Sequence, residues 1–342
     1  QVGLNVAADP LMSLAYVGVK GGMVIVSADD PGPISSQTEQ DTRRFADFCR
    51  IPVFDPSSPE EAYKMIGDAF EYSEKYNTPV LFRPTTRVCH AYASIDNCDS
   101  PSPKKYEGFV KDSKKWVIFP RLSFANHIMI EKRNVEIGKD FSTYSANKAE
   151  GRNSEKAVVT SGISYAYTKE CLKDYPDVKL IKIATAYPFP EDFVLSSLEG
   201  TKEVLCIEEL SPFIEEQILK LTGKHGLQLK VSGKLDGKVQ AGGENSTDKI
   251  AAILGEFLGK DFTAEGYDLS DAPALPVRPP VLCAGCPHRA SFYAVKQAMK
   301  GRKAYFCGDI GCYTLGNAMP LDMVDTCLCM GAGITMAQGF NH

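Results

Sequence analysis

The sequence lacks several features, and each absence excludes a class of protein. No apolar run reaches the roughly 18–20 residues that a membrane-spanning helix needs. Lys and Arg total 38 against 43 Asp and Glu, a formal net charge of −5. That balance, with no Lys/Arg run, argues against a nucleic-acid-binding surface and against a membrane-binding one. We find no internal repeat and no low-complexity tract.

Cysteine is abundant by comparison, and it is unevenly placed. Five of the eleven cysteines are scattered, and we expect each to be a small buried hydrophobe: Cys49, Cys89, Cys98, Cys171 and Cys206. The other six fall between Cys283 and Cys329. Since no signal peptide opens the printed sequence, this local cluster indicates metal or redox chemistry in a reducing, cytoplasmic setting.

Alternating strand and helix patterns predict an α/β fold with parallel sheets. In the first segment, strands at 21–30 and 77–86 flank a helix at 58–76 that starts with Ser58-Pro59-Glu60-Glu61. Residues 96–154 are polar and predict a long connection with one helix at 121–133. A second α/β unit then follows, with strand–helix patterns at 156–175, 178–198 and 202–223 and a last helix at 246–259.

Two glutamates, Glu208 and Glu209, end the last strand of that unit. They suit general acid–base work, but we favour solvated or helix-capping carboxylates. The proline-rich stretch 271–282 marks the clearest boundary. The third unit stops inside an apolar, small-residue run, and the chain starts at Gln1 without an initiator Met. We therefore expect an excised piece of a longer protein.

The motif "CAGCPHR" (283–289) is compatible with several kinds of site. The pair Cys283 and Cys286 has metal-ligand spacing, and Cys312 is a third candidate ligand. Structural zinc, a redox dithiol, an iron–sulfur corner and a ligand-free turn all stay open. His288 and Arg289 open a helix, whose free amides favour phosphate or diphosphate; a histidine that only packs locally is the alternative.

Two glycine-rich turns and one polar loop are further candidates. Gly308, Asp309 and Gly311 follow a strand-like run, and Gly331 and Gly333 precede a helix as a second potential phosphate cradle, without dinucleotide spacing. The loop 27–44 follows a buried strand and is dense in Ser, Gln and carboxylates. This composition fits a solvated loop and also a loop that faces a substrate or an interface.

Taken together, "VGLNVAADPLMSLAYVGVKGGMVIVSADDP", "SSQTEQDTRRFADFCRIPVFDP", "PVLFRPTTRVCH", "VLCIEELSPFIEEQ" and "CAGCPHR…GDIGCYTLG…DTCLCMGAG" resemble the large (alpha) subunits of the indolepyruvate ferredoxin oxidoreductase family. The similarity covers nearly the whole chain and is weakest in 96–154 and 225–270. It implies a thiamine-diphosphate-enzyme fold of several doubly wound parallel-sheet domains, the first and last truncated. The implied divisions are the later half of a pyrimidine-binding domain (1–95), a connecting segment (96–154), a transketolase C-terminal-like domain (155–260), a Pro-rich linker (261–280) and the start of a diphosphate-binding domain (281–342).

The resemblance also implies an activity. The family decarboxylates aryl-2-oxoacids such as indolepyruvate on thiamine diphosphate, passes electrons through iron–sulfur clusters to ferredoxin and transfers the acyl group to CoA. The implied partners are a small beta subunit and ferredoxin, in a hetero-oligomer. A non-catalytic remnant or a metal-binding module of the same fold is the alternative.

Site residues carry over by position. The implied cofactor-binding residues are His288, Arg289, Gly308, Asp309, Ile310, Gly311, Met330 and Gly331. The substrate or interface loop would use Asp29, Asp30, Ser35, Ser36 and Gln37. Cys283, Cys286 and Cys312 would hold part of a [4Fe-4S] cluster or would instead line the diphosphate site. The catalytic glutamate is expected before Gln1, and the Mg²⁺ motif and further cluster ligands beyond His342, so we expect residues 1–342 to be inactive alone.

Overall fold

The computed structural model describes every residue except 1, 35, 97–107, 263–269, 277–278 and 341–342. Contacts divide the chain into two compact units, Gln1–Gly266 and Tyr267–His342, and each is described by itself. None of the helices in the described ranges is long and apolar enough to cross a membrane.

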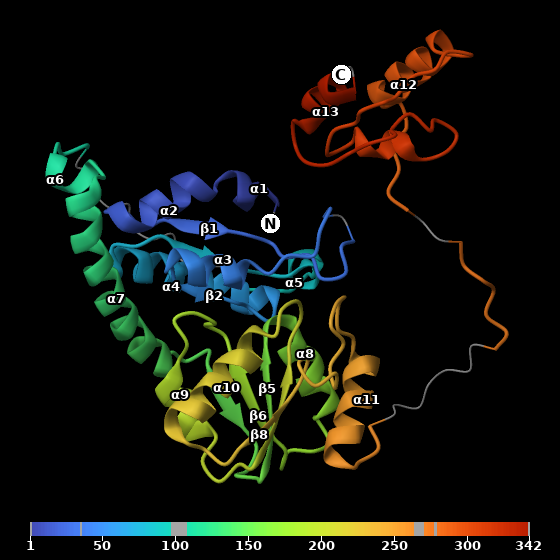
Figure 1. Cartoon of the computed structure of the whole chain (residues 1–342). Coiled ribbons are helices and arrows are strands. Elements are labelled where there is room, and N and C mark those ends of the chain that lie inside the picture. The colour runs from blue at the N-terminus through green and yellow to red at the C-terminus, as the bar shows by residue number, and fades with distance from the viewer. Residues whose placement is uncertain (1, 35, 97–107, 263–269, 277–278, 341–342) are drawn as a thin grey trace. The chain divides into compact units, whose positions relative to one another are not determined.

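The first unit holds two sheets (Figure 1). The smaller sheet is fully parallel, with the strand order β1 (Val24–Val26), β3 (Val80–Phe82), β2 (Val53–Phe54). Its connections and flanks are helical: α1 (Val2–Val6), α2 (Ala8–Val17), α3 (Thr42–Cys49), α4 (Pro59–Tyr76) and α5 (Thr86–His90). The crossover from β2 through α4 to β3 is the strand–helix–strand pattern expected of a parallel sheet.

Local sequence explains the best-predicted helix, α4. The Ser58 hydroxyl accepts a hydrogen bond from the Glu61 amide at 3.2 Å, and Pro59 occupies the first turn. Glu60 and Glu61 complement the positive end of the helix dipole. Asn77 ends the helix in the left-handed region, with φ of 51°.

The larger sheet has five strands in the order β4 (Lys148–Glu150), β6 (Lys179–Ile183), β5 (Lys156–Ser161), β7 (Glu203–Ile207), β8 (Lys230–Ser232). Only the β4–β6 pairing is antiparallel. Its helices are α8 (Gly162–Cys171), α9 (Glu191–Ser197), α10 (Phe213–His225) and α11 (Thr247–Leu258). The expected α/β class with parallel-dominated sheets is thus confirmed.

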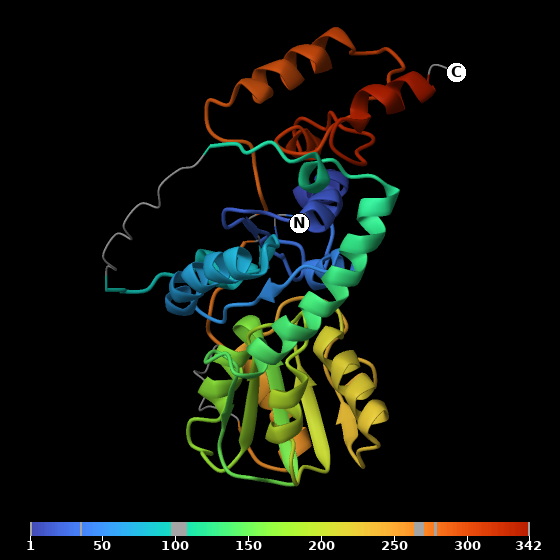
Figure 2. The same ribbon diagram turned by 90° about the vertical axis from the view of Figure 1, so that its left-hand side faces the viewer.

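One long helix connects the two sheets. α7 (Pro120–Ser142) follows the short α6 (Ser113–Trp116), and it contacts α2 beside the smaller sheet and α9 beside the larger one. Figures 1 and 2 both show α7 running along the two sheets. The helix is ten residues longer than the 121–133 that the sequence predicted, because Ile137 and Phe141 continue its buried face.

The hydrophobic core is continuous between the two sheets. Val53 and Leu81 from the smaller sheet, with Ile51 just before β2, pack in one buried cluster with Ile181 and Ile183 from the larger sheet. The Val53 amide of the smaller sheet donates a hydrogen bond to the Tyr187 carbonyl, which follows β6 of the larger sheet, at 2.7 Å, so a backbone hydrogen bond also joins the two parts. Shared burial of this kind holds the two sheets in a fixed relation.

The second unit is small and has few buried side chains. It contains α12 (Pro287–Ala298), a 3₁₀ turn (Thr314–Asn317) and α13 (Ala332–Phe340). The strand expected from "KAYFCGDIGC" does not form among the described residues. A single parallel bridge between Cys307 and Thr326 stands there instead, because this stretch has no neighbouring strand to pair with along its length.

The four isolated cysteines among the described residues differ in burial. Cys49 and Cys206 are buried, as expected. Cys171 is half-buried and Cys89 is exposed, so the expectation of a buried hydrophobe is wrong for Cys89. Cys98 lies outside the described residues.

Candidate functional site

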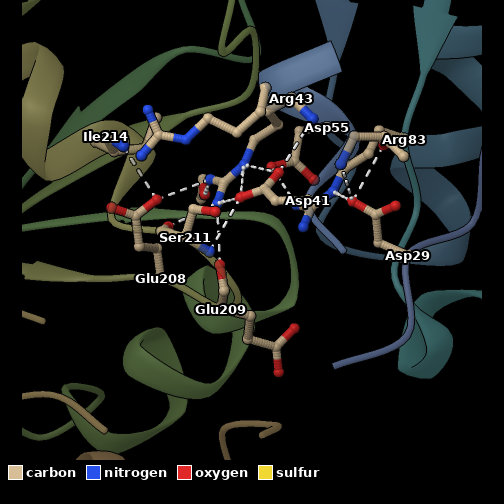
Figure 3. A network of polar contacts seen from close by, with 12 residues as sticks. Asp29, Asp41, Arg43, Asp55, Arg83, Glu208, Glu209, Ser211 and Ile214 are labelled. Atoms are coloured by element: carbon tan, nitrogen blue, oxygen red, sulfur yellow. Dashed lines mark hydrogen bonds and ion pairs between the residues drawn. The ribbon is translucent and has the colours of Figure 1, made fainter. Parts of the chain in front are cut away.

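The carboxyl ends of strands from both sheets meet in the first unit. Asp55 follows β2, Arg83 follows β3 and Glu208 follows β7 directly, while Asp29 lies three residues beyond β1. In open α/β sheets this edge is where ligands bind. Here the two edges face each other across a buried network of charges, which we call the junction (Figure 3).

Arg43, near the start of α3, is the most heavily engaged residue of that network. Its Nε donates to Asp41 Oδ1 at 2.9 Å and its Nη2 to Asp41 Oδ2 at 2.6 Å, a bidentate pair. Nη1 reaches Glu208 Oε2 at 2.8 Å, and Nη2 also donates to the backbone carbonyl of Glu209 at 2.9 Å. The side chain is completely buried, so it joins the two sheets through charge rather than through apolar contact.

Arg83 is the second buried guanidinium. Its Nε donates to Asp29 Oδ2 at 2.7 Å and its Nη1 to Asp55 Oδ2 at 3.1 Å. Asp29 Oδ2 also accepts from the amide of Thr42 at 3.0 Å. The ends of β1, β2 and β3 are therefore tied to the start of α3.

Burial and charge move the pKa values of these carboxyl groups in opposite directions. Burial would raise the pKa of Asp41, but the Arg43 guanidinium outweighs it and lowers that pKa to about 2. Burial raises the pKa of Asp55 and of Glu208, although Arg83 and Arg43 respectively oppose it.

Glu209 is a buried carboxyl whose pKa lies near neutrality. It is buried and accepts a hydrogen bond from the Asn245 amide at 2.8 Å. Burial raises its pKa to about 7, against the effect of that amide. A carboxyl of this kind can exchange a proton near pH 7, a property that functional sites often use.

Glu208 instead has a structural task. Its carboxylate accepts from the amides of Ile214 and Glu215, each at 3.0 Å, in the first turn of α10. The helix-capping role that we favoured for this strand end is thus confirmed for Glu208.

The junction also contains buried polar atoms that lack a hydrogen-bond partner among the described residues: Ser27 Oγ, Asp29 Oδ1, Asp55 Oδ1, Arg83 Nη2 and Thr85 Oγ1. All five come from the ends of the three strands of the smaller sheet. Buried polar atoms of this kind are met by ordered water or by a polar ligand. The junction therefore holds buried charge and fixes the loops that follow these strands.

The loop expected to face a substrate or an interface has a fixed base and an exposed tip. Asp29 and Asp30 are buried, and the Asp30 carboxylate accepts from the Ser36 amide at 2.8 Å and from the Thr86 hydroxyl at 2.6 Å. Gln37 is exposed and Ser36 half-buried. Ser35 lies outside the described residues. The two aspartates thus shape the loop, and its tip is what remains to meet another molecule.

Glu39 connects this loop to residues 240–245, which follow β8 of the larger sheet. Its carboxylate accepts from the amide of Gly32 at 3.0 Å and from that of Gly243 at 2.9 Å. Nearby, Arg87 Nε donates to Glu244 at 2.6 Å. Loop 27–40 and loop 240–245 are therefore held side by side.

In the second unit, "CAGCPHR" forms a turn that leads into α12. The Cys286 amide donates to the Cys283 carbonyl at 3.2 Å, and no side chain caps the helix. His288 Nδ1 lies 3.2 Å from Cys286 Sγ, and its ring meets that of Tyr313 edge-to-face at 4.9 Å. Arg289 turns back and donates to the Cys283 carbonyl at 3.0 Å, so its guanidinium stabilises the turn.

The two glycine-rich turns are brought together by Asp309. Its carboxylate accepts from the Ile310 amide at 2.7 Å and from the Gly331 amide at 2.8 Å. The backbones are in close contact, because a Cβ at Gly333 would lie 2.8 Å from the Gly308 carbonyl oxygen. Gly333 lies inside α13, not before it as expected. Gly311 and Met330 are exposed, at the edges of this contact.

A cavity of about 600 Å³ in the same unit is lined by Asp309 and Tyr313 together with Phe292 and Ile334. Tyr313 connects this cavity to His288 through the ring contact. Of the eight predicted cofactor-binding residues, the structure joins Gly308, Asp309, Ile310 and Gly331 most directly.

The candidate cluster cysteines do not form a ligand set as they lie. Cys283 and Cys312 are exposed and Cys286 is half-buried. Within the described part of the chain, no three or more Cys, His, Asp or Glu side chains are grouped so that they could hold a metal ion. These residues therefore do not fit an iron–sulfur cluster by themselves, and the cluster remains a prediction.

Sequence reasoning did not single out the buried charges that join the sheets. Arg43, Asp41, Asp55 and Arg83 were not identified, although the first two lie inside the polar loop that was. One signal was present: Asp55 and Arg83 each stand directly after a short apolar strand, where a buried polar side chain is well placed to bind or brace.

Comparison with curated proteins finds similar sequences over 99% of the chain. No protein-family profile matches it. The indolepyruvate oxidoreductase subunit IorA of Thermococcus kodakarensis is 38% identical over 354 residues, which cover 99% of this chain and 54% of that protein. IorA of Methanothermobacter thermautotrophicus is 38% identical over 349 residues, covering 99% of this chain and 56% of the relative.

Among solved structures, the 2-oxoglutarate:ferredoxin oxidoreductase from Magnetococcus marinus aligns with a TM-score of 0.48 at 13% identity, covering 73% of this chain and 55% of that one. The chain spans about half the length of the curated relatives that it matches. Over 99% of its length, the chain is therefore similar to about half the length of the IorA subunits of indolepyruvate oxidoreductase.

Proposed function

We propose that the chain is part of an enzyme that oxidatively decarboxylates aryl-2-oxoacids such as indolepyruvate. The products are carbon dioxide and the aryl-acetyl-CoA, and the two electrons released reduce ferredoxin. The observation that carries this proposal is the 38% identity to IorA subunits across 99% of the chain. Because the chain spans about half of those relatives, the activity belongs to the whole protein with its small beta subunit.

Thiamine diphosphate is the proposed cofactor; when bound, it supplies the electron sink on which decarboxylation of a 2-oxoacid depends. The amino end of α12 fits an anionic group, because its first amides have no side-chain cap. His288 stands at that end with a ring nitrogen available to donate or accept. Arg289 holds the turn through the Leu282 and Cys283 carbonyls, so we assign it to shaping the site.

The glycine-rich turns would complete the cofactor site. Asp309 fixes both turns through the Ile310 and Gly331 amides, and Gly308 and Gly333 allow the two backbones to touch. We assign Asp309 to positioning, since these amides already engage its carboxylate. The Mg²⁺ ligands and the remaining cluster ligands are proposed to come from outside residues 1–342.

The first unit would present the substrate loop. The proposed divisions are a pyrimidine-binding part in residues 1–95, the range of the smaller sheet, and a transketolase C-terminal-like domain in residues 155–260, the range of four of the five strands of the larger sheet. The buried junction of Arg43 and Arg83 would then fix the loop whose tip carries Ser36 and Gln37. Ferredoxin and CoA are the proposed partner and co-substrate.

Product analysis tests the proposal. The gene product that contains this chain is purified without oxygen together with its small subunit, and indolepyruvate, CoA and oxidised ferredoxin are added. Mass spectrometry is expected to detect indoleacetyl-CoA, and the chain of residues 1–342 alone is expected to form none. If the purified complex forms no acyl-CoA from indolepyruvate, phenylpyruvate or other 2-oxoacids, the proposed activity is wrong and a non-catalytic remnant remains.

A further inference from the structure

A cavity in the first unit, whose lining shares no residue with the charge network of Arg43 and Arg83, is lined mostly by one sign of charge. It has a volume of about 660 Å³, within the usual range for small-molecule sites, and lies between α2, α4, α6 and α7. Its lining includes four basic side chains, Lys75, Lys114, Lys115 and Arg133, and one acidic side chain, Glu136.

Arg133 is the unusual member of this lining. Its Nε and Nη2 atoms are enclosed by protein and have no hydrogen-bond partner among the described residues. Burial lowers its pKa to about 10, and only the Tyr187 hydroxyl opposes the shift. The guanidinium therefore remains charged near neutral pH without a carboxylate beside it, a costly arrangement for a side chain out of water.

The acidic groups around the cavity are engaged elsewhere. Glu136 pairs with Lys139 at 2.9 Å, one turn along the outer surface of α7. Asp140 pairs with Lys75 and accepts from the Tyr76 hydroxyl. Asp140 thus offsets Lys75, one of the four lining cations, but neither carboxylate neutralises Arg133. With Lys114 and Lys115, Arg133 leaves the cavity with an excess of positive charge.

The rest of the lining is apolar or aromatic. Leu122, Met129 and Ile130 come from α7, and Tyr16 and Tyr76 from α2 and α4. Apolar walls with a small number of charged groups are typical of sites that bind small organic molecules. This wall would bury the body of a ligand whose charged end meets the cation.

We propose that this cavity binds a small organic anion, with a carboxylate or phosphate group that pairs with Arg133 and an aromatic or aliphatic body that packs against Met129 and Tyr76. The anion supplies the negative charge that the Arg133 guanidinium lacks beside it. Lys114 and Lys115, on α6, add positive charge at the same cavity. The site lies apart from the buried junction and does not depend on the proposed oxidoreductase activity.

Calorimetric titration of the full chain tests the site, at constant ionic strength, with phenyl phosphate, benzoate and inorganic phosphate as probes. At least one aromatic anion is expected to bind the unsubstituted chain, and at least tenfold more tightly than inorganic phosphate. Which aromatic anion binds better identifies the charged group. Arg133→Met is expected to weaken binding at least tenfold. The matched control, Lys132→Met, removes an exposed cation from the same helix outside the cavity and should change affinity less than twofold.

A second variant keeps the test decisive if Arg133→Met does not fold. Met129 is 60% exposed, so a polar side chain is tolerated there, and it precedes Arg133 by one helical turn. Met129→Glu places a carboxylate where it can pair with Arg133 at i,i+4. This variant is expected to melt at a higher temperature than the unsubstituted chain and to bind the anion at least tenfold more weakly. If no probe binds the unsubstituted chain, or if Met129→Glu or a folded Arg133→Met binds as tightly as it does, the proposal is wrong.

Discussion

Replacing Arg43 by Met would test whether buried charge joins the two sheets. The substitution keeps an unbranched apolar side chain but removes the bidentate pair with Asp41 and the bond to Glu208. Both carboxylates are almost completely buried, at 1% exposure, and Asp41 would lose its principal partner. Removing one partner of a buried ion pair typically costs ~3–5 kcal/mol, and we expect a loss of that size in the free energy of unfolding.

The neighbouring residue provides a matched control. Arg44 pairs bidentately with Glu216, but their side chains are 39% and 40% exposed. An exposed pair is worth about 0–1 kcal/mol, so Arg44→Met should cost little. Both variants remove one positive charge from α3, and both arginines lie over the Phe213 ring. Equilibrium unfolding in urea, followed by circular dichroism of the full chain, gives the two losses.

The pH dependence of the loss gives an independent check. Asp41 has a folded-state pKa of about 2, below its ordinary 3.8, so it contributes stability that is present above pH 3.8 and is lost as the pH falls toward 2. Without Arg43, burial would raise that pKa instead, and Asp41 would take up a proton more readily. The deficit of Arg43→Met should therefore be smaller at pH 5 than at pH 8. A deficit no larger than that of Arg44→Met, at either pH, would refute the role given to Arg43.

Three further predictions concern other parts of the chain. Glu209 has a folded-state pKa of about 7 against its ordinary value of 4.5, so its contribution to stability is full below pH 4.5 and is lost as the pH rises through 7. Glu209→Gln mimics the protonated carboxyl and should therefore gain stability relative to the unsubstituted chain between pH 5 and 8, as measured by urea unfolding. Glu39→Gln should speed amide hydrogen exchange in residues 32–38, because the Glu39 carboxylate accepts from the Gly32 and Gly243 amides, whereas Glu216→Gln should not. Equal exchange in both variants would contradict this role of Glu39. Gly333→Ala should destabilise the second unit and speed amide hydrogen exchange in residues 306–333, since its Cβ would lie 2.8 Å from the Gly308 carbonyl oxygen. Gly339→Ala meets no atom within 4 Å, so it should stabilise α13 by roughly 0.5–1 kcal/mol and leave that exchange no faster.

The local elements of the fold could be predicted from the sequence because their signals are local. Ser58 and Pro59 mark the start of α4 as they would in an isolated helix, and the apolar runs at 156–161 and 203–207 match β5 and β7. The end of α7 was missed because Ile137 and Phe141 are buried only once α7 meets the rest of the unit. The hydrophobic periodicity of a helix does not by itself show which elements the helix will pack against.

The junction could not be predicted because its partners are far apart in sequence. Arg43 and Glu208 are 165 residues apart, and a buried arginine looks in sequence like any surface cation. Two aspartates placed in the substrate loop proved to face inward, since Arg83 and Thr86 bind them. Conversely, contact between the turns around Asp309 and Gly331 was not predicted, although both turns were singled out.

The most direct test of the proposed function is reduction of ferredoxin. The complete protein with its small subunit is stripped of thiamine diphosphate and Mg²⁺ without oxygen, and ferredoxin absorbance is followed after indolepyruvate and CoA are added. We predict no reduction until both thiamine diphosphate and Mg²⁺ are restored, and then two electrons for each indolepyruvate consumed. Reduction that is equally fast without restored cofactor, or none with it, would contradict the account.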